Sequence, residues 1–180
     1  GNYDIGRGRT NSDIFAINGV TNYAPISSIV ISFVNIKSKI AQQSSLIRTN
    51  LTYNELFEIY NYNPDLYQYI GKFVSKCRKR YPIIKNSALG GIIAYLIIDR
   101  KYDKEYIFNF FNELYQFIPG TNKSVDALRN TLIRNLANPK KYSSDIILNL
   151  TLRCFNYYKN GINISFLRVP EGRVIVTKNI

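Results

Sequence analysis

The chain has no histidine, methionine or tryptophan among its 180 residues, and only two cysteines. The lack of histidine excludes zinc sites that depend on imidazole, HNH-type nucleases, and Ser-His or Cys-His catalysis, because each needs an imidazole to bind a metal or to move a proton. Cys77 and Cys154 belong to no CxxC motif. Two isolated cysteines are typical of a reducing cytoplasm, although they leave room for one disulfide.

Acidic residues are also scarce, with 12 Asp and Glu against 24 Lys and Arg and a net charge of +12. Several acids fall at expected helix starts, such as Asp13, Glu55 and Asp103, where a capping role explains them. A carboxylate-metal nuclease needs two or more acids around one ion, which this pattern does not favour. We therefore expect no metal, no cofactor and no enzymatic activity. The excess of positive charge indicates a polyanionic partner.

Long hydrophobic runs are missing as well. The longest nearly uncharged apolar stretch, Ser87 to Ile98, is too short to span a bilayer. Residues 1–10 are polar and glycine-rich, unlike a signal peptide. We expect no membrane partner and a cytoplasmic location. Because the chain starts at Gly1 and contains no Met, we also expect it to be a processed or trimmed form.

Apolar residues recur at helical spacing along most of the chain and predict an all-α protein, a multi-helix bundle of about seven helices. The apolar stretch from Ser87 to Ile98 is expected at its centre. Glycine is expected to end the first helix near Gly19 and the last at Gly161. Predicted helix starts carry N-cap residues: Thr10 with Asp13, Thr52 with Glu55, Asp103, Ser124, and Ser143 or Ser144.

The last part of the chain has a different residue pattern. Ile162, Ile164 and Phe166 alternate with polar residues, and residues 174–176 are rich in β-branched side chains. This pattern predicts a short extended segment or β-hairpin at the C-terminus. The expected organisation is a junction at 1–10, a helical domain at 11–161 and an extended segment at 162–180.

Basic residues gather in two blocks. Residues 72–85 contain six cations and no acid, and they fall largely on a helix predicted from Pro64 to Pro82. Its apolar stripe is predicted to consist of Leu66, Tyr69, Ile70, Phe73, Val74 and Cys77. The cations Lys72, Lys76, Lys79 and Arg80 recur opposite that stripe, as expected for a helix that follows a phosphate backbone. The alternative is a solvated helix face.

Three tyrosines near this block, Tyr67, Tyr69 and Tyr81, are candidates for stacking on unpaired bases. The second basic block begins at Lys140 and Lys141 and runs to the end of the chain, with seven cations against two acids. Both of these lysines are candidate phosphate contacts.

Residues 6–10 read GRGRT, so that Arg7 and Arg9 lie on a glycine-rich loop beside a helix start. Such arginines can bind phosphates, although the motif taken alone favours an ordinary loop in which they pair with Asp4 or Asp13. The spacing does not match a phosphate-binding GxxxxGK[ST] loop.

Two stretches carry a family resemblance. Residues 3–13 read YDIGRGRTNSD, and residues 128–168 contain, in order, Leu128-Arg129, Phe155-Asn156, Gly161 and Leu167-Arg168. The first resembles a D-x-G-x-x-R-T-x-x-D segment of phage and mobile-element proteins related to the ParB/sulfiredoxin-like superfamily, where it follows the ParB-like domain. The second is similar to the C-terminal helical region of that family.

The resemblance implies that Asp4, Arg7, Arg9, Thr10 and Asp13 join a missing N-terminal ParB-like domain to the helical one. Two departures matter. The usual Trp is here Phe155, and the D-G-x-x-R signature of the ParB-like domain is absent from these residues. Nucleotide-binding or nuclease activity would belong to that domain, so we do not expect it of this chain.

The combined expectation is a non-catalytic nucleic-acid-binding domain, with DNA preferred over RNA as the partner, in which basic helix faces contact phosphate. The alternative is a protein-interaction module that docks on its own missing N-terminal domain or on an acidic partner. A nuclease fragment is a third hypothesis, which metal-dependent cleavage of plasmid would demonstrate. Nothing in the sequence indicates base-specific readout or an oligomeric state.

Overall fold

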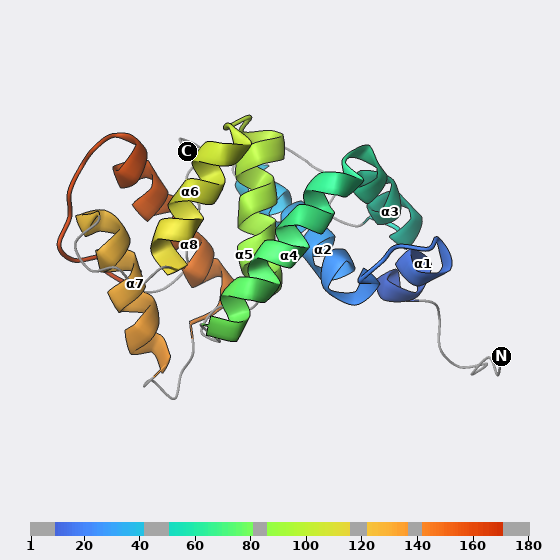
Figure 1. Ribbon diagram of the computed structural model, residues 1–180, viewed down its shortest axis with the longest axis horizontal. Coiled ribbons are helices and arrows are strands. Elements are labelled where there is room, and N and C mark those ends of the chain that lie inside the picture. The colour runs from blue at the N-terminus through green and yellow to red at the C-terminus, as the bar shows by residue number, and fades with distance from the viewer. Residues whose placement is uncertain (1–9, 42–50, 81–85, 116–121, 137–141, 171–180) are drawn as a thin grey trace.

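Every regular element that the computed structural model describes is a helix (Figure 1). The described residues are 10–41, 51–80, 86–115, 122–136 and 142–170, and they contain eight α-helices, one π-helical turn and no strand. The predicted all-α class is confirmed. The elements are α1 (Asn11–Ile17), α2 (Tyr23–Ala41), α3 (Tyr53–Tyr62), α4 (Pro64–Arg80), α5 (Asn86–Ala94), η1 (Tyr95–Asp99), α6 (Lys104–Tyr115), α7 (Lys123–Leu136) and α8 (Ser144–Lys159).

Two helices begin with the capping boxes that the sequence predicts. The Asp13 N–H donates to Thr10 Oγ1 at 3.2 Å, and the Thr10 N–H donates to Asp13 Oδ2 at 2.8 Å. Thr52 and Glu55 form the same pair of bonds at 3.2 and 2.7 Å at the start of α3. Each box satisfies backbone donors that a helix start leaves without an intrahelical partner.

The predicted caps of two later helices are also present, and a third is displaced. Asp103 accepts from the backbone at the start of α6, and Ser143 does so at the start of α8. The prediction that Ser124 begins α7 is wrong, because Asn122 Oδ1 accepts from the Ser124 and Val125 N–H groups at 2.9 and 3.1 Å. Ser124 itself is fully buried and bonds the C-terminal segment instead.

Glycines in the left-handed region end α1 and α8, as predicted. Gly161 has φ +65°, its N–H donates to the Tyr158 carbonyl at 3.2 Å, and the Ile162 N–H donates to the Tyr157 carbonyl at 2.9 Å. This pair of bonds defines a Schellman motif. Gly19, with φ +74°, ends α1 with the same pattern.

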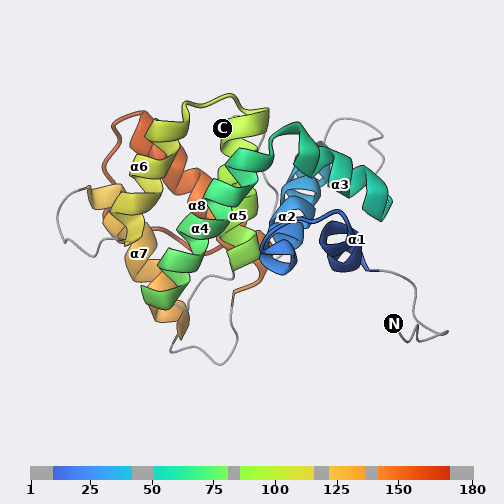
Figure 2. The ribbon, with the colours of Figure 1, turned by 45° about the vertical axis from the view of Figure 1, so that its right-hand side comes forward.

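The centre of the molecule is the packing of α5 against α2, with α4 crossing both of these helices (Figures 1 and 2). A close approach explains the Gly90-Gly91 pair in α5. A Cβ added at Gly91 would lie 2.9 Å from the backbone carbonyl carbon of Ser32, closer than real contacts allow. The apolar segment expected at the centre therefore does lie there, with its glycines facing α2.

At one end of the molecule, α6, α7 and α8 pack together, while α1 and α3 lie at the other end (Figure 1). Phe155 of α8 is fully buried among the rings of Tyr102, Tyr106 and Phe110, with centroids 5.0 to 6.1 Å away. Most of these pairs are edge-to-face, the arrangement that aromatic quadrupoles favour. The buried apolar side chains of the described residues form one continuous cluster.

Arg129 of α7 ties the end of α6 to α7. It is only 7% exposed, and it donates through Nε to the Leu114 carbonyl at 2.9 Å and through Nη2 to the Glu113 carbonyl at 2.6 Å. It also pairs with Asp126. Since the last carbonyls of a helix have no intrahelical donor, Arg129 acts as a side-chain cap for α6.

Residues 162–170 follow α8 without forming a strand. Ser124 Oγ donates to the Ile162 carbonyl at 2.7 Å and accepts from the Ile164 N–H at 3.1 Å, and Leu167 is buried at 1% exposure. The segment is thus packed against α7. The predicted hairpin is not shown in these residues, and its second half, residues 174–176, lies outside the described ranges.

Candidate nucleic-acid interface

The helix α4 presents the cationic face that the sequence predicts. Ile70, Val74 and Cys77 are buried along one side, whereas Lys72 and Lys76 are exposed on the other. The two lysines are one helical turn apart, about 6 Å along the axis. Neither makes a hydrogen bond or ion pair with the other residues that the structure describes. Both ammonium groups are therefore available to an anionic partner.

The assignment of the tyrosines requires a correction. Tyr67, predicted as a stacking residue, is 1% exposed and packs against Phe33 and Tyr60 of the neighbouring helices. Tyr69, predicted as part of the buried stripe, is 48% exposed. The burial of α4 is therefore rotated toward α2 and α3, because those helices cover the side of α4 that carries Tyr67. Tyr81 lies outside the described residues.

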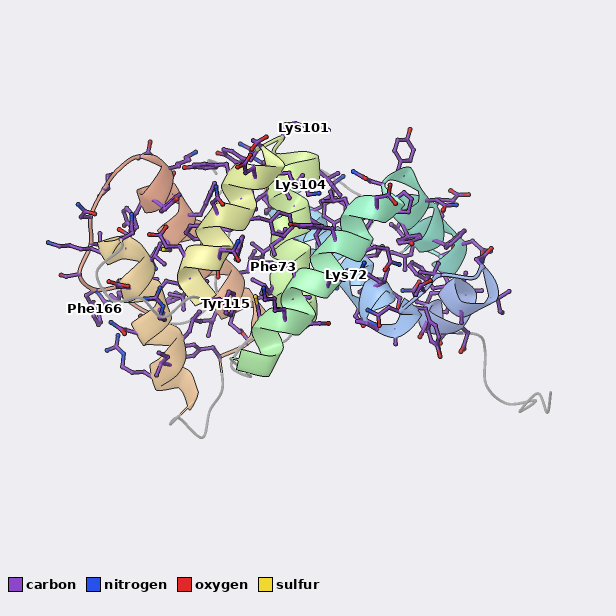
Figure 3. All side chains as sticks on the ribbon, in the orientation of Figure 1. Lys72, Phe73, Lys101, Lys104, Tyr115 and Phe166 are labelled. Carbon is purple, nitrogen blue, oxygen red and sulfur yellow. The ribbon has the colours of Figure 1, made fainter. Side chains whose placement is uncertain are left out.

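A third lysine joins this surface from α6. Lys104 Nζ lies 4.0 Å from the centroid of the Tyr69 ring, a cation–π contact that holds the ammonium beside α4. Tyr69 is itself supported by an edge-to-face contact with Phe108 of α6, which also contacts Phe73. Figure 3 shows Lys72 and Phe73 on α4 and Lys104 at the start of the neighbouring α6.

We call the exposed lysines Lys72, Lys76 and Lys104 the α4–α6 cationic surface. Tyr69, Lys72 and Lys76 are at positions i, i+3 and i+7 of one helix, so they share a face. Sequence reasoning missed Lys104, because it falls in a stretch that carries a slight excess of acid. The one signal for it was its place beside Asp103, a predicted helix start.

Polar contacts fix α4 in the orientation that exposes this surface. Gln68 Nε2 donates to the Thr21 carbonyl at 2.8 Å and to the Tyr60 hydroxyl at 3.1 Å. The first bond reaches the turn between α1 and α2, and the second reaches α3. One side chain thus ties α4 to two other parts of the fold.

Several predicted site residues fall where the structure does not describe them. Lys79 and Arg80 belong to the last turn of α4, but their side chains lie outside the described part, as do Arg7, Arg9, Lys140 and Lys141 entirely. Within the described residues there are 16 Lys and Arg against 10 Asp and Glu, a net charge of +6. Half of the net positive charge of the chain is thus carried by the described fold.

Other cations of the fold serve internal contacts. Lys37 pairs with Asp99 at 3.5 Å, and Lys39 pairs with Asp145 of α8. Arg153 donates to the Arg168 carbonyl at 2.9 Å. These cations therefore differ from those of the α4–α6 cationic surface, which have no acidic partner among the described residues.

The residues that carry the C-terminal resemblance stabilise the fold. Arg129 caps α6, Phe155 fills the aromatic core, Gly161 ends α8 and Leu167 anchors the segment after it. None of them lies on the α4–α6 cationic surface. The motif thus describes packing of the last two helices.

Both cysteines are buried free thiols. Burial raises the pKa of Cys77 to about 11, against a smaller opposing effect of neighbouring Lys76, and burial raises that of Cys154 to about 12. Burial also raises the pKa of Glu113, with Arg129 opposing the shift. In the described ranges, no three Cys, Asp or Glu side chains gather as a metal site would require. Nor does any described helix combine the length and apolar character needed to cross a membrane.

Comparisons of the chain with protein-family models, with curated proteins and with solved structures give no match. The functional argument therefore depends on the residues and their geometry.

Proposed function

We propose that this protein is a non-catalytic nucleic-acid-binding domain that holds phosphates through the α4–α6 cationic surface. The observation that carries the proposal is the pair Lys72 and Lys76, exposed one turn apart on one helix and without acidic partners among the described residues. The helix dipole does not account for these two lysines, because its effect is confined to the last turn of α4, residues 77–80. Lys104 of α6 adds a third cation to the same surface.

The proposed contact is electrostatic and independent of base sequence. Duplex DNA carries one negative charge per about 1.7 Å of its axis, so a row of lysines about 6 Å apart meets phosphates in any register. Each phosphate that a lysine neutralises releases counterions. We propose DNA as the partner in preference to RNA because the sequence resembles ParB-like proteins of phages and mobile elements, a relationship that itself remains part of the proposal.

Charge reversal tests this proposal. We expect Lys76→Glu to weaken binding to a duplex oligonucleotide by about tenfold or more, since it replaces an attraction with a repulsion. Lys123→Glu is the matched control, because Lys123 is also exposed, lies in the first turn of α7 outside the α4–α6 cationic surface, and gives the same change in net charge. Fluorescence anisotropy of labelled DNA measures both affinities.

The same experiment separates the alternative, in which the chain docks on a ParB-like domain or on an acidic protein. If Lys76→Glu and Lys123→Glu weaken DNA binding equally, the α4–α6 cationic surface is not the site and binding reflects net charge alone. If neither affects DNA binding but Lys76→Glu abolishes binding to an acidic partner, the interaction module is the correct function.

A further inference from the structure

A cavity of about 560 Å³ lies between α2, α3, α4 and η1, on a part of the molecule distinct from the α4–α6 cationic surface. Ligand cavities in proteins typically measure about 300–1,000 Å³ and are mostly apolar with a few polar groups. This one fits that description. Its wall includes Val34, Leu51, Ile59, Tyr67, Ile98 and Lys101.

The packing around the cavity is incomplete on its inner side. Tyr67 lines the wall, is 1% exposed, and its hydroxyl has no hydrogen-bond partner. A buried hydroxyl without a partner destabilises a protein, so such groups are rare in folded proteins. The half-buried Ile59, Ile97 and Ile98 also leave apolar surface facing the cavity.

The backbone on one side of the cavity is irregular. The helix begun by α5 continues as the π-helical turn η1, a feature that is rare and frequent at functional sites. After η1, Lys101 adopts φ +61°, in the left-handed region where glycine is the favoured residue. Lysine is strained there because its Cβ approaches the following carbonyl oxygen. The strained turn places the Lys101 side chain at the edge of the cavity.

The charges at the rim favour an anion. Lys37 already pairs with Asp99 at 3.5 Å. Lys101 is exposed and has no partner among the described residues, so its ammonium is the unneutralised charge at the cavity. Figure 3 shows Lys101 at the edge of the molecule, beyond the end of the central helix.

We propose that this cavity binds an aliphatic carboxylate, with the hydrocarbon chain against Val34, Ile59 and Ile98 and the carboxylate at Lys101. Aliphatic side chains outnumber aromatic ones in the wall, which therefore matches an aliphatic chain better than a polar ring, and the cation of Lys101 selects an anionic head group. The inference is independent of the nucleic-acid proposal, since it involves none of Lys72, Lys76 and Lys104.

Calorimetric titration with ligands of one chain length and different head groups tests the proposal. We expect monomeric decanoate to bind with a Kd of about 0.1 mM or tighter, decanol to bind more weakly, and decyltrimethylammonium not to bind. Lack of decanoate binding would overturn the proposal. So would retention by anionic lipid vesicles without binding of monomeric decanoate, because the surface would then recognise a membrane.

The variant Lys101→Gly separates the role of the side chain from its effect on folding. It removes the ammonium while supplying the residue that φ +61° favours, so the thermal midpoint should not fall. We expect decanoate affinity to fall about three- to tenfold and decanol affinity to stay unchanged. Lys39→Ala, on α2 but outside this cavity, is the control and should change neither. An unchanged ratio of decanoate to decanol affinity in Lys101→Gly would contradict the assignment.

Discussion

The side chain of Arg129 illustrates how one charged residue can hold two helices together. Its guanidinium is buried against two carbonyls at the end of α6 and against Asp126 of its own helix. We expect Arg129→Ala to lower the free energy of unfolding by about 3 kcal/mol, because it removes the donor to two carbonyls of α6 and the buried cation that pairs with the half-buried Asp126. Urea denaturation followed by circular dichroism measures the change.

Arg134 supplies the control for that measurement. It lies on the same helix, is exposed and rests over Phe166 at 5.4 Å. We expect Arg134→Ala to change the free energy of unfolding by less than about 1 kcal/mol. Equal effects of the two substitutions would contradict the capping role of Arg129.

The two thiols give a prediction that depends on pH. Their raised pKa values, about 11 for Cys77 and about 12 for Cys154, mean that the unfolded chain loses thiol protons at lower pH than the folded one. The contribution of the two protonated thiols to the free energy of unfolding is therefore complete below the ordinary thiol pKa of 9.0. It is lost as the pH rises through 11 and 12.

Alkylation with iodoacetamide at about pH 8 measures this directly, because the thiolate is the reactive species. We expect Cys77 in the folded protein to react at least about a hundredfold more slowly than in urea, and Cys154 more slowly still. Mass spectrometry of digested samples distinguishes the two sites. Comparable rates in the folded and unfolded protein would show that the thiols are not buried.

Among the elements, the crossing of α2 and α5 is the most sensitive to side-chain size. An added methyl group at Gly91 meets the Ser32 backbone carbonyl carbon at 2.9 Å, and backbone cannot rotate away. We expect Gly91→Ala to destabilise the fold by about 1–3 kcal/mol despite the better helix propensity of alanine. Thermal denaturation measures the effect.

Gly71 of α4 is the matched comparison. There the added methyl group meets Ile26 Cδ1 at 2.7 Å, the end of a side chain that can adopt another rotamer. We expect Gly71→Ala to be nearly neutral, because the gain in helix propensity of about 1 kcal/mol offsets the repacking. If Gly71→Ala were the more damaging of the two, the proposed geometry of the α2–α5 crossing would be wrong.

Helix boundaries could be predicted from the sequence where the signal is local. The boxes at Thr10 and Thr52 and the stop at Gly161 depend on residues within one turn of each other, so short patterns suffice. The start of α7 could not be predicted, because Ser124 is engaged by a segment that follows α8. The π-helical turn and the strained Lys101 depend on the packing of neighbouring helices and leave no local signature.

Which side of a helix is buried depends on the helices that pack against it. The candidate site could therefore be predicted only in part from the sequence of α4. Opposite placement of apolar residues and lysines predicted the exposure of Lys72 and Lys76 correctly. It was wrong to treat Tyr67 as a stacking candidate, because that side chain is buried, and to place Tyr69 in the buried stripe, because that side chain is exposed. Lys104 joined the surface through a contact between residues far apart in the sequence.

At the scale of the whole molecule, the two candidate sites are separate from each other and lie outside the buried core. One continuous apolar cluster stabilises the bundle. Several cations pair with acids or carbonyls of the fold, and the described residues together carry a net charge of +6. The cavity beside η1 and the α4–α6 cationic surface are separate. Each can be altered by its own substitution, so the two proposals are tested independently.

The central claim is that exposed lysines of α4 and α6 neutralise phosphates, and its most direct measurement is the salt dependence of DNA affinity. Each neutralised phosphate contributes about −0.9 to the slope of log Kobs against log salt, so the three lysines predict a slope of about −3 or steeper between about 50 and 200 mM salt. Lys72→Ala and Lys76→Ala should each make it shallower by about 1. A slope near zero, or one that both substitutions leave unchanged, would contradict the claim.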